Sequence, residues 1–149
     1  MSPAKLALLL LTLLLAGCMA PTGMAATPAG SAPPADLDFS ATRLGDNGIF
    51  RATYKSDIDP TPLNELHAWT LHVETADGAP VEHATIRVSG DMPEHGHGMP
   101  TQPQVTQELG GGDYRVEGMR FQMGGWWTVT FDIEAGGAND RVTFNLRLK

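Results

Sequence analysis

Apolar and polar residues alternate along almost the whole chain after its first 36 residues, and this pattern constrains the fold more than any other feature. In one segment, Trp69, Leu71 and Val73 would point to one face of a strand, and Thr70 and His72 to the other. Because the side chains of a β-strand alternate between two faces, the pattern predicts strands with one buried face. The same period of two recurs in segments 50–55, 84–88, 114–118, 127–134 and 141–148, and a short strand is expected over 105–109.

Tight turns separate these predicted strands. Asp77-Gly78 is a strong hairpin sequence, and the glycine-rich segments 110–113 and 136–137 are further turns. Seven or eight short strands joined in this way predict an all-β fold, an immunoglobulin-like antiparallel β-sandwich over residues 37–149. A small closed barrel is the structural alternative. The chain has a single cysteine, so it lacks the Cys–Trp–Cys core of antibody domains.

The first 17 residues have the pattern of a lipoprotein signal peptide. Lys5 supplies a positive charge, and residues 6–16 form an apolar run that is too short to span a bilayer. The run ends in Leu-Ala-Gly followed by Cys18, which resembles the bacterial lipobox. We therefore expect Cys18 to be lipidated after cleavage. An ordinary secretory signal cut after Ala20 or Ala26 is the alternative.

Residues 18–36 are predicted to form a flexible tether that starts at the lipidated cysteine. The segment is rich in Ala, Pro, Gly and Ser and has no apolar periodicity, so it cannot contribute to a core. The expected location is the cell envelope, with the domain anchored by lipid and facing the periplasm. By resemblance to the usual sorting rule, Met19 after the cysteine permits delivery to the outer membrane.

The net charge of −7 excludes one class of partner. A nucleic-acid phosphate backbone requires a basic surface, so an acidic domain is not expected to bind nucleic acid.

Successive antiparallel strands place several loops at the same end of the predicted sandwich. If the turn at Asp77-Gly78 marks one end, then His67, the loop 91–104 and Met123 gather at the other. Segment 56–65, directly before His67, is expected to join them.

The loop 91–104 has the most distinctive chemistry in the chain, because two histidines and two methionines occur within eight positions, between Gly and Pro residues. Imidazole suits copper, zinc, iron and nickel, whereas thioether sulfur selects the softer Cu(I). A ligand set without cysteine also suits an oxidising compartment. The sequence therefore predicts a metal site, with copper as the favoured ion. Its candidate ligands are His97, His95, Met92, Met99, Met123 and His67.

Other interpretations of these residues stay open at this point. Met99 and Met123 could pack beneath the loop as core side chains. His67 could support the loop as a partner of a ligand and not bind metal itself. Trp69, Trp126 and Trp127 are interpreted as core and rim residues. No nucleophile–base or acid–base arrangement is visible, so we do not predict an enzyme or any catalytic residue.

Four segments, 62–70, 78–81, 92–100 and 114–126, together resemble the YtkA-like domain, which is related to the FixH family of small exported or membrane-tethered proteins. The resemblance covers residues 60–148 and implies an immunoglobulin-like sandwich without established enzymatic activity. Because FixH-type proteins are linked to copper-oxidase assembly, it also implies a copper transporter or oxidase-assembly protein as partner. His97-Gly98 and Met123-Gly124 match the family motif, whereas many relatives have another residue at His95.

Two other functions are compatible with the same residues. The domain could be a scaffold that binds a partner protein without metal, in which case the histidines and methionines of the loop only pack. It could also be a small-molecule carrier, because some YtkA-like proteins are labelled auxin-binding. A carrier requires an apolar pocket with a few polar groups.

Overall fold

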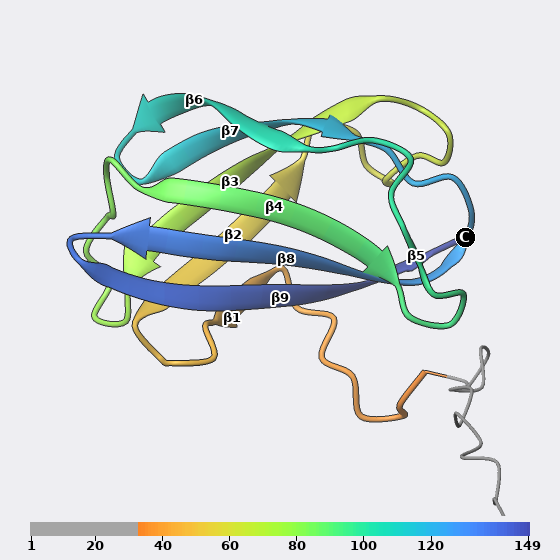
Figure 1. Ribbon diagram of the computed structural model, residues 1–149, viewed down its shortest axis with the longest axis horizontal. Helices are drawn as coiled ribbons and strands as arrows, with labels where there is room; N and C mark the ends of the chain where they lie inside the picture. The colour runs from red at the N-terminus through yellow and green to blue at the C-terminus, as the bar shows by residue number, and fades with distance from the viewer. Residues whose placement is uncertain (1–32) are drawn as a thin grey trace, which may run out of the picture.

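The computed structural model describes residues 33–149, so the predicted signal peptide, Cys18 and most of the predicted tether lie outside the described residues (Figure 1). The described part is built of strands, which confirms the all-β prediction. Within it, no helix is long and apolar enough to cross a membrane. The strands are β1 (Thr42–Leu44), β2 (Phe50–Ser56), β3 (His67–Thr75), β4 (Thr85–Met92), β5 (His97–Gly98), β6 (Gln104–Gly110), β7 (Asp113–Met119), β8 (Gly125–Ala135) and β9 (Ala138–Leu148).

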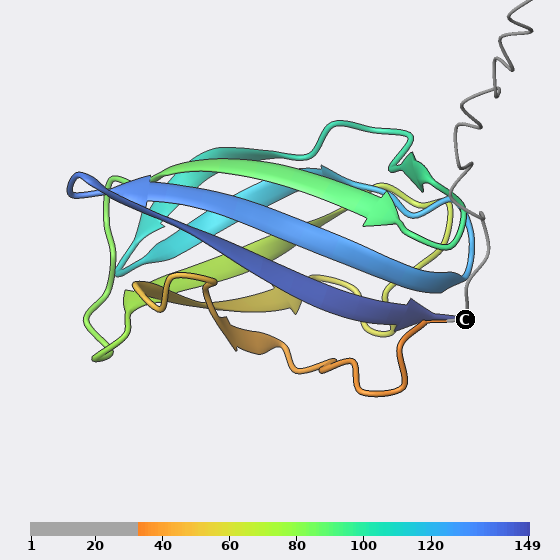
Figure 2. The ribbon, with the colours of Figure 1, turned by 60° about the horizontal axis from the view of Figure 1, so that its bottom comes forward.

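The strand order is that of an immunoglobulin-like sandwich. Hydrogen-bonded neighbours follow the path β1-β2-β3-β7-β6-β4-β8-β9, and every pair of strands is antiparallel. The seven longest strands form β2-β3-β7-β6 and β4-β8-β9, which is the ABED and CFG order of constant-type immunoglobulin domains. The two layers are visible in Figures 1 and 2. This order confirms the predicted sandwich architecture.

The two layers join along one edge through a single residue pair. Arg87 of β4 is opposite Gln104 of β6, and no other pair links these two strands. At the opposite edge, the path ends at β1 and β9, which are not paired with each other. There the ring of Tyr54 packs edge-on against Phe144, with centroids 4.9 Å apart. The sheet is therefore strongly curved without being a closed barrel.

The core lies between the layers and consists of the apolar residues whose alternation predicted the strands. Trp69, Leu71 and Val73 of β3 are fully buried. They belong to the same core cluster as Val129 and Phe131 of β8, which are equally buried. The predicted inner face of β4 is only partly covered: Ile86 and Val88 are half-buried. The reason is the poor pairing of β4 with β6, which leaves the edge of the core open.

The segment 91–104 is not a continuous loop, in contrast to the sequence prediction. β4 continues to Met92, and the chain then reverses and pairs back on it through β5. The reversal is held by the backbone N–H groups of His95 and Gly96, which donate to the carbonyl of Met92 over 3.0 and 2.9 Å. Gly96 takes a φ of 66°, a conformation that glycine adopts without strain.

The opposite end of the sandwich is held by a buried carboxylate. Asp140 is 4% exposed, and its two oxygens accept hydrogen bonds from the backbone N–H groups of Asn47, Ile49, Phe50 and Arg141 over 2.8–3.1 Å. Burial would raise the pKa of Asp140, but the four N–H donors outweigh it and hold the pKa below its ordinary value. Asp140 therefore ties the turn between β1 and β2 to the start of β9.

The first described residues run along the outside of β9, from the end of the sandwich where the chain finishes (Figures 1 and 2). The side-chain amide of Asn145 donates to the carbonyl of Asp38 over 3.0 Å. The guanidinium of Arg147 lies over the ring of Phe39, 5.1 Å from its centroid. The N-terminal part of the domain and its C-terminus are therefore at the same end.

Candidate functional site

The elements that carry the predicted ligands meet at one end of the sandwich, the right-hand end in Figure 1, which we call the loop end. His67 begins β3 and is paired with Met119 at the end of β7. The segment before it is joined to the same end through a bridge between Leu63 and Phe121. β4 ends and β8 begins here as well. The topological prediction from the sequence is thus confirmed.

His95 and His97 lie close together at the loop end. Their ring centroids are 5.9 Å apart, with planes inclined by 32°. In histidine–metal sites the metal–nitrogen distance is about 2.0–2.1 Å, so two imidazoles on one ion have ring centres no more than about 6.5 Å apart. The observed spacing fits two imidazoles that share one ion. His95 is exposed and His97 is half-buried, so an ion could reach both from solvent.

The ring of His97 is held from two sides. It packs edge-on against the buried Trp127, with centroids 5.8 Å apart. Its Nδ1 is 3.1 Å from the carbonyl oxygen of Gly98 and 3.1 Å from the amide Nε2 of Gln122. Because both contacts use Nδ1, Nε2 is the nitrogen left for a ligand. Metal-binding histidines commonly donate the other ring N–H to a carbonyl, which the Gly98 oxygen could accept.

Met92 is the methionine that lies closest to the histidine pair in the strand register. It is directly opposite His97 in the β4–β5 ladder, and opposite residues have Cβ atoms about 5 Å apart. Its side chain is 1% exposed, and its terminal methyl lies where a side chain on Gly125 would begin.

The backbone conformation of Gly125 favours glycine at this position, and this gives a stability prediction. It has a φ of 129°, and a Cβ there would collide with the methyl of Met92. We expect Gly125→Ala to lower the free energy of unfolding by about 2 kcal/mol, mainly because alanine is strained at this φ, and the buried methyl of Met92 would also have to move. Gly136→Ala is the matched control, since Gly136 has a φ of 59° and no atom lies within 4 Å of its Cβ position. Urea unfolding of both variants makes the comparison; equal losses would contradict the role of Met92.

The other two methionines serve the packing around the site. The side chain of Met99 covers Gly90 of β4. Met123 is half-buried against the core, and its carbonyl accepts a hydrogen bond from the indole Nε1 of Trp127 over 3.0 Å. The backbone carbonyl of Met123 therefore holds Trp127 next to the site, while the Met123 side chain packs against the core.

His67 lies at the loop end but is separated from the histidine pair. It is 7% exposed, its Nδ1 is 3.1 Å from the carbonyl of Glu65, and its Nε2 has no hydrogen-bond partner among the described residues. Two aromatic rings lie between it and His97. The successive centroid distances from His67 to Phe121, Trp127 and His97 are 5.8, 5.2 and 5.8 Å. The structure thus does not bring His67 together with His95 and His97.

Residues that the sequence did not single out complete the site. Gln122 contacts His97, and Glu94 accepts a long hydrogen bond of 3.4 Å from the backbone N–H of Trp126. The sequence indicated the position of Gln122 only through its neighbour Met123, which it precedes in the same predicted loop. Within residues 33–149, no three His, Cys, Asp or Glu side chains are grouped so as to hold a metal. An ion at this site would therefore need a thioether or an outside ligand besides the two imidazoles.

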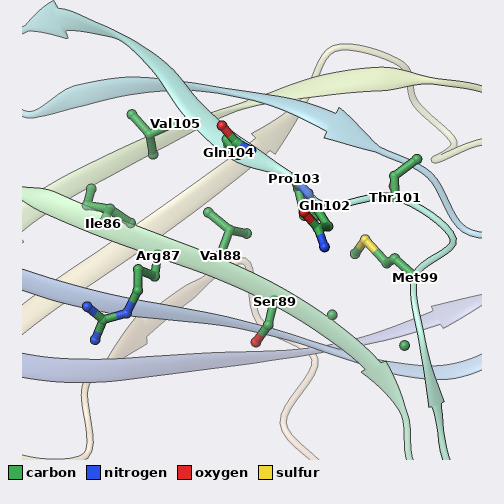
Figure 3. Close-up of a pocket in the computed structure, with 12 residues that line it drawn as sticks. Ile86, Arg87, Val88, Ser89, Met99, Thr101, Gln102, Pro103, Gln104 and Val105 are labelled. Atoms are coloured by element: carbon green, nitrogen blue, oxygen red, sulfur yellow. The ribbon is translucent and has the colours of Figure 1, made fainter.

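An open groove runs beside the site between β4 and segment 99–105 (Figure 3). Its volume is about 580 Å³, and half-buried Ile86, Val88, Met99 and Val105 supply apolar surface. Among the described residues that line it, Arg87 alone is charged, and its guanidinium points away from the groove. The groove follows directly from the single pair that joins β4 and β6.

Comparison with known proteins gives one family and one structure. A family model described as YtkA-like matches residues 50–132, which is more than half of the chain. Among solved structures, the chain is similar to the ZirS C-terminal domain, with 18% identity over 86% of this chain and 90% of that chain and a TM-score of 0.37. That likeness carries no argument about function. The sequence matches none of the curated proteins with which it was compared.

Proposed function

The chain belongs to the YtkA-like family, and from this premise we propose that it is a copper-binding lipoprotein of the cell envelope. The observation that carries the proposal is the pair of imidazoles of His95 and His97, whose 5.9 Å spacing fits one shared ion. Met92, opposite His97, adds the thioether that favours copper, and Cu(I) in particular, over zinc. These side chains bind and orient the ion, while any redox chemistry would be supplied by copper.

The proposed location rests on the sequence. Cys18 follows the apolar run of the predicted signal peptide and would carry the lipid. The domain would then face the periplasm from a membrane, with the outer membrane as the expected one. A copper transporter or an oxidase-assembly protein is the partner that this location and cargo suggest.

Copper binding can be tested through the tryptophan fluorescence of the chain, to which Trp127 contributes together with Trp69 and Trp126. The ring of Trp127 is 5.8 Å from that of His97, so a Cu(II) ion bound by His97 should quench much of its emission. We expect strong quenching in the full chain, made with Cys18→Ser so that no lipid is attached, and little quenching in His97→Ala. His83→Ala is the control, because the His83 side chain is 88% exposed and pairs with Glu108 away from the site. Equal quenching in His97→Ala would contradict the proposal.

The two other candidate functions have less support. A carrier for an auxin-like carboxylate would require a positive charge facing the groove, and the guanidinium of Arg87 points away from it. A partner-binding scaffold would need no free nitrogen on His97, whereas the contacts of this ring leave Nε2 unused. We therefore favour metal binding.

A further inference from the structure

Gln122 makes the one side-chain hydrogen bond described for the imidazole of His97. Three atoms form a nearly equilateral contact: Nδ1 of His97, the carbonyl oxygen of Gly98 and Nε2 of Gln122, each 3.1 Å from the others. The carbonyl can only accept a hydrogen bond, and the amide nitrogen can only donate. The carbonyl of Gly98 therefore requires a proton on Nδ1, whereas the amide nitrogen of Gln122 requires a lone pair there.

These demands determine which ring nitrogen carries the proton. A neutral imidazole is protonated at Nδ1 or at Nε2, and the hydrogen bonds of each nitrogen select between the two tautomers. With the amide nitrogen toward the ring, Gln122 keeps both of its hydrogen bonds only if Nδ1 is the acceptor. His97 then carries its proton on Nε2, the nitrogen that would otherwise meet an ion.

The other end of the same amide has no partner. Oε1 of Gln122 is buried without a hydrogen bond among the described residues. If the amide turned over, Oε1 would face Nδ1 and accept its proton together with the Gly98 carbonyl. That arrangement would leave the lone pair of Nε2 free, as a metal-bound histidine requires.

We propose that Gln122 is a positioning residue that selects the tautomer of His97 and so controls whether Nε2 is open to a metal. In the described orientation, Gln122 favours the Nε2–H form, and metal binding has to move this proton to Nδ1 or remove it. The inference rests on the proposed function only in naming the metal. The tautomer itself is a property of the metal-free protein.

The test is ¹⁵N NMR of the histidine rings in the metal-free full chain carrying Cys18→Ser, at a pH well above the ordinary pKa of histidine. We expect the His97 shifts to report the Nε2–H form in the parent chain. Gln122→Leu removes the donor, and Gln122→Glu replaces it with an acceptor. Both variants should raise the ratio of the Nδ1–H tautomer to the Nε2–H tautomer of His97 several-fold. Gln102→Leu is the control, because Gln102 lies on the neighbouring segment without a described contact to His97.

Unchanged His97 shifts in both Gln122 variants would overturn the inference, whether or not the protein binds copper. A second readout is the Cu(I) affinity, which should rise several-fold in Gln122→Glu and fall if Gln122 merely supports the loop. If the parent chain binds no copper while the tautomer shifts as expected, the proposed function fails and the role of Gln122 stands.

Discussion

Replacing His97 with alanine is expected to lower the copper affinity of the protein by about a hundredfold or more. Loss of a side chain that only supports a ligand commonly costs 10–100-fold in metal affinity, so loss of a ligand itself should cost at least as much. His97 is expected to dominate because its ring is held by Trp127 and by the carbonyl of Gly98 before an ion arrives. Within residues 33–149, the exposed side chain of His95 makes no hydrogen bond, so its removal should lower the copper affinity by less.

The measurement is competition for Cu(I) with a colorimetric chelator, on the full chain carrying Cys18→Ser. His83→Ala is the matched control and should leave the affinity unchanged. Urea unfolding of His97→Ala separates the alternatives. If the free energy of unfolding falls and the copper affinity is unchanged, the loop histidine serves packing, and the partner-binding scaffold becomes the better hypothesis.

Asp140→Ala is expected to lower the free energy of unfolding by about 3 kcal/mol or more, the largest loss of stability that we predict. The variant leaves four backbone N–H groups without their acceptor, and a hydrogen bond to a charged group contributes about 1.5–3 kcal/mol. Asp140→Asn keeps the shape but turns an amide toward donors, so we expect a loss of about 2 kcal/mol. Asp46→Asn is the control, because Asp46 is exposed and close in sequence to the same turn.

The same carboxylate predicts how stability depends on pH. Its pKa is lowered in the folded protein from the ordinary value of 3.8. The contribution of Asp140 to the free energy of unfolding is therefore fully present well above pH 3.8, and it is lost as the pH falls through the lower pKa of the folded state. Urea unfolding from neutral to acidic pH should show this loss in the parent chain and a flatter curve in Asp140→Asn. Parallel curves would contradict the assignment.

The fold could be predicted from the sequence because burial follows the alternation of side chains. Trp69, Leu71 and Val73 face the core as the period of two requires, and the turns at 110–113 and 136–137 join paired strands, β6 with β7 and β8 with β9. The hairpin predicted at Asp77-Gly78 was wrong, because β3 pairs with β2 and β7 and not with β4. The exposure of Ile86 and Val88 could not be predicted in this way. Their coverage depends on how far β4 pairs with β6, which is set by long-range packing and not by the local pattern.

The sequence predicted at which end of the sandwich the candidate residues lie, but not which of them lie close together. Strand direction places His67 and His97 at the same end, but depth within that end depends on Phe121 and Trp127, which lie between them. The strand β5 has two residues, too few to show an alternating pattern, so the pairing of Met92 with His97 could not be predicted from the sequence. Gln122 was missed because an amide has no metal-binding pattern of its own.

The course of residues 33–41 shows at which end of the sandwich the predicted tether joins the domain. They leave the sandwich from the loop end, the end that carries His95 and His97 (Figure 2). If Cys18 is lipidated as proposed, the tether joins the domain at this end, so the imidazoles would lie on the same end as the attachment to the membrane. A protein embedded in the same membrane would then be within reach of the proposed copper site.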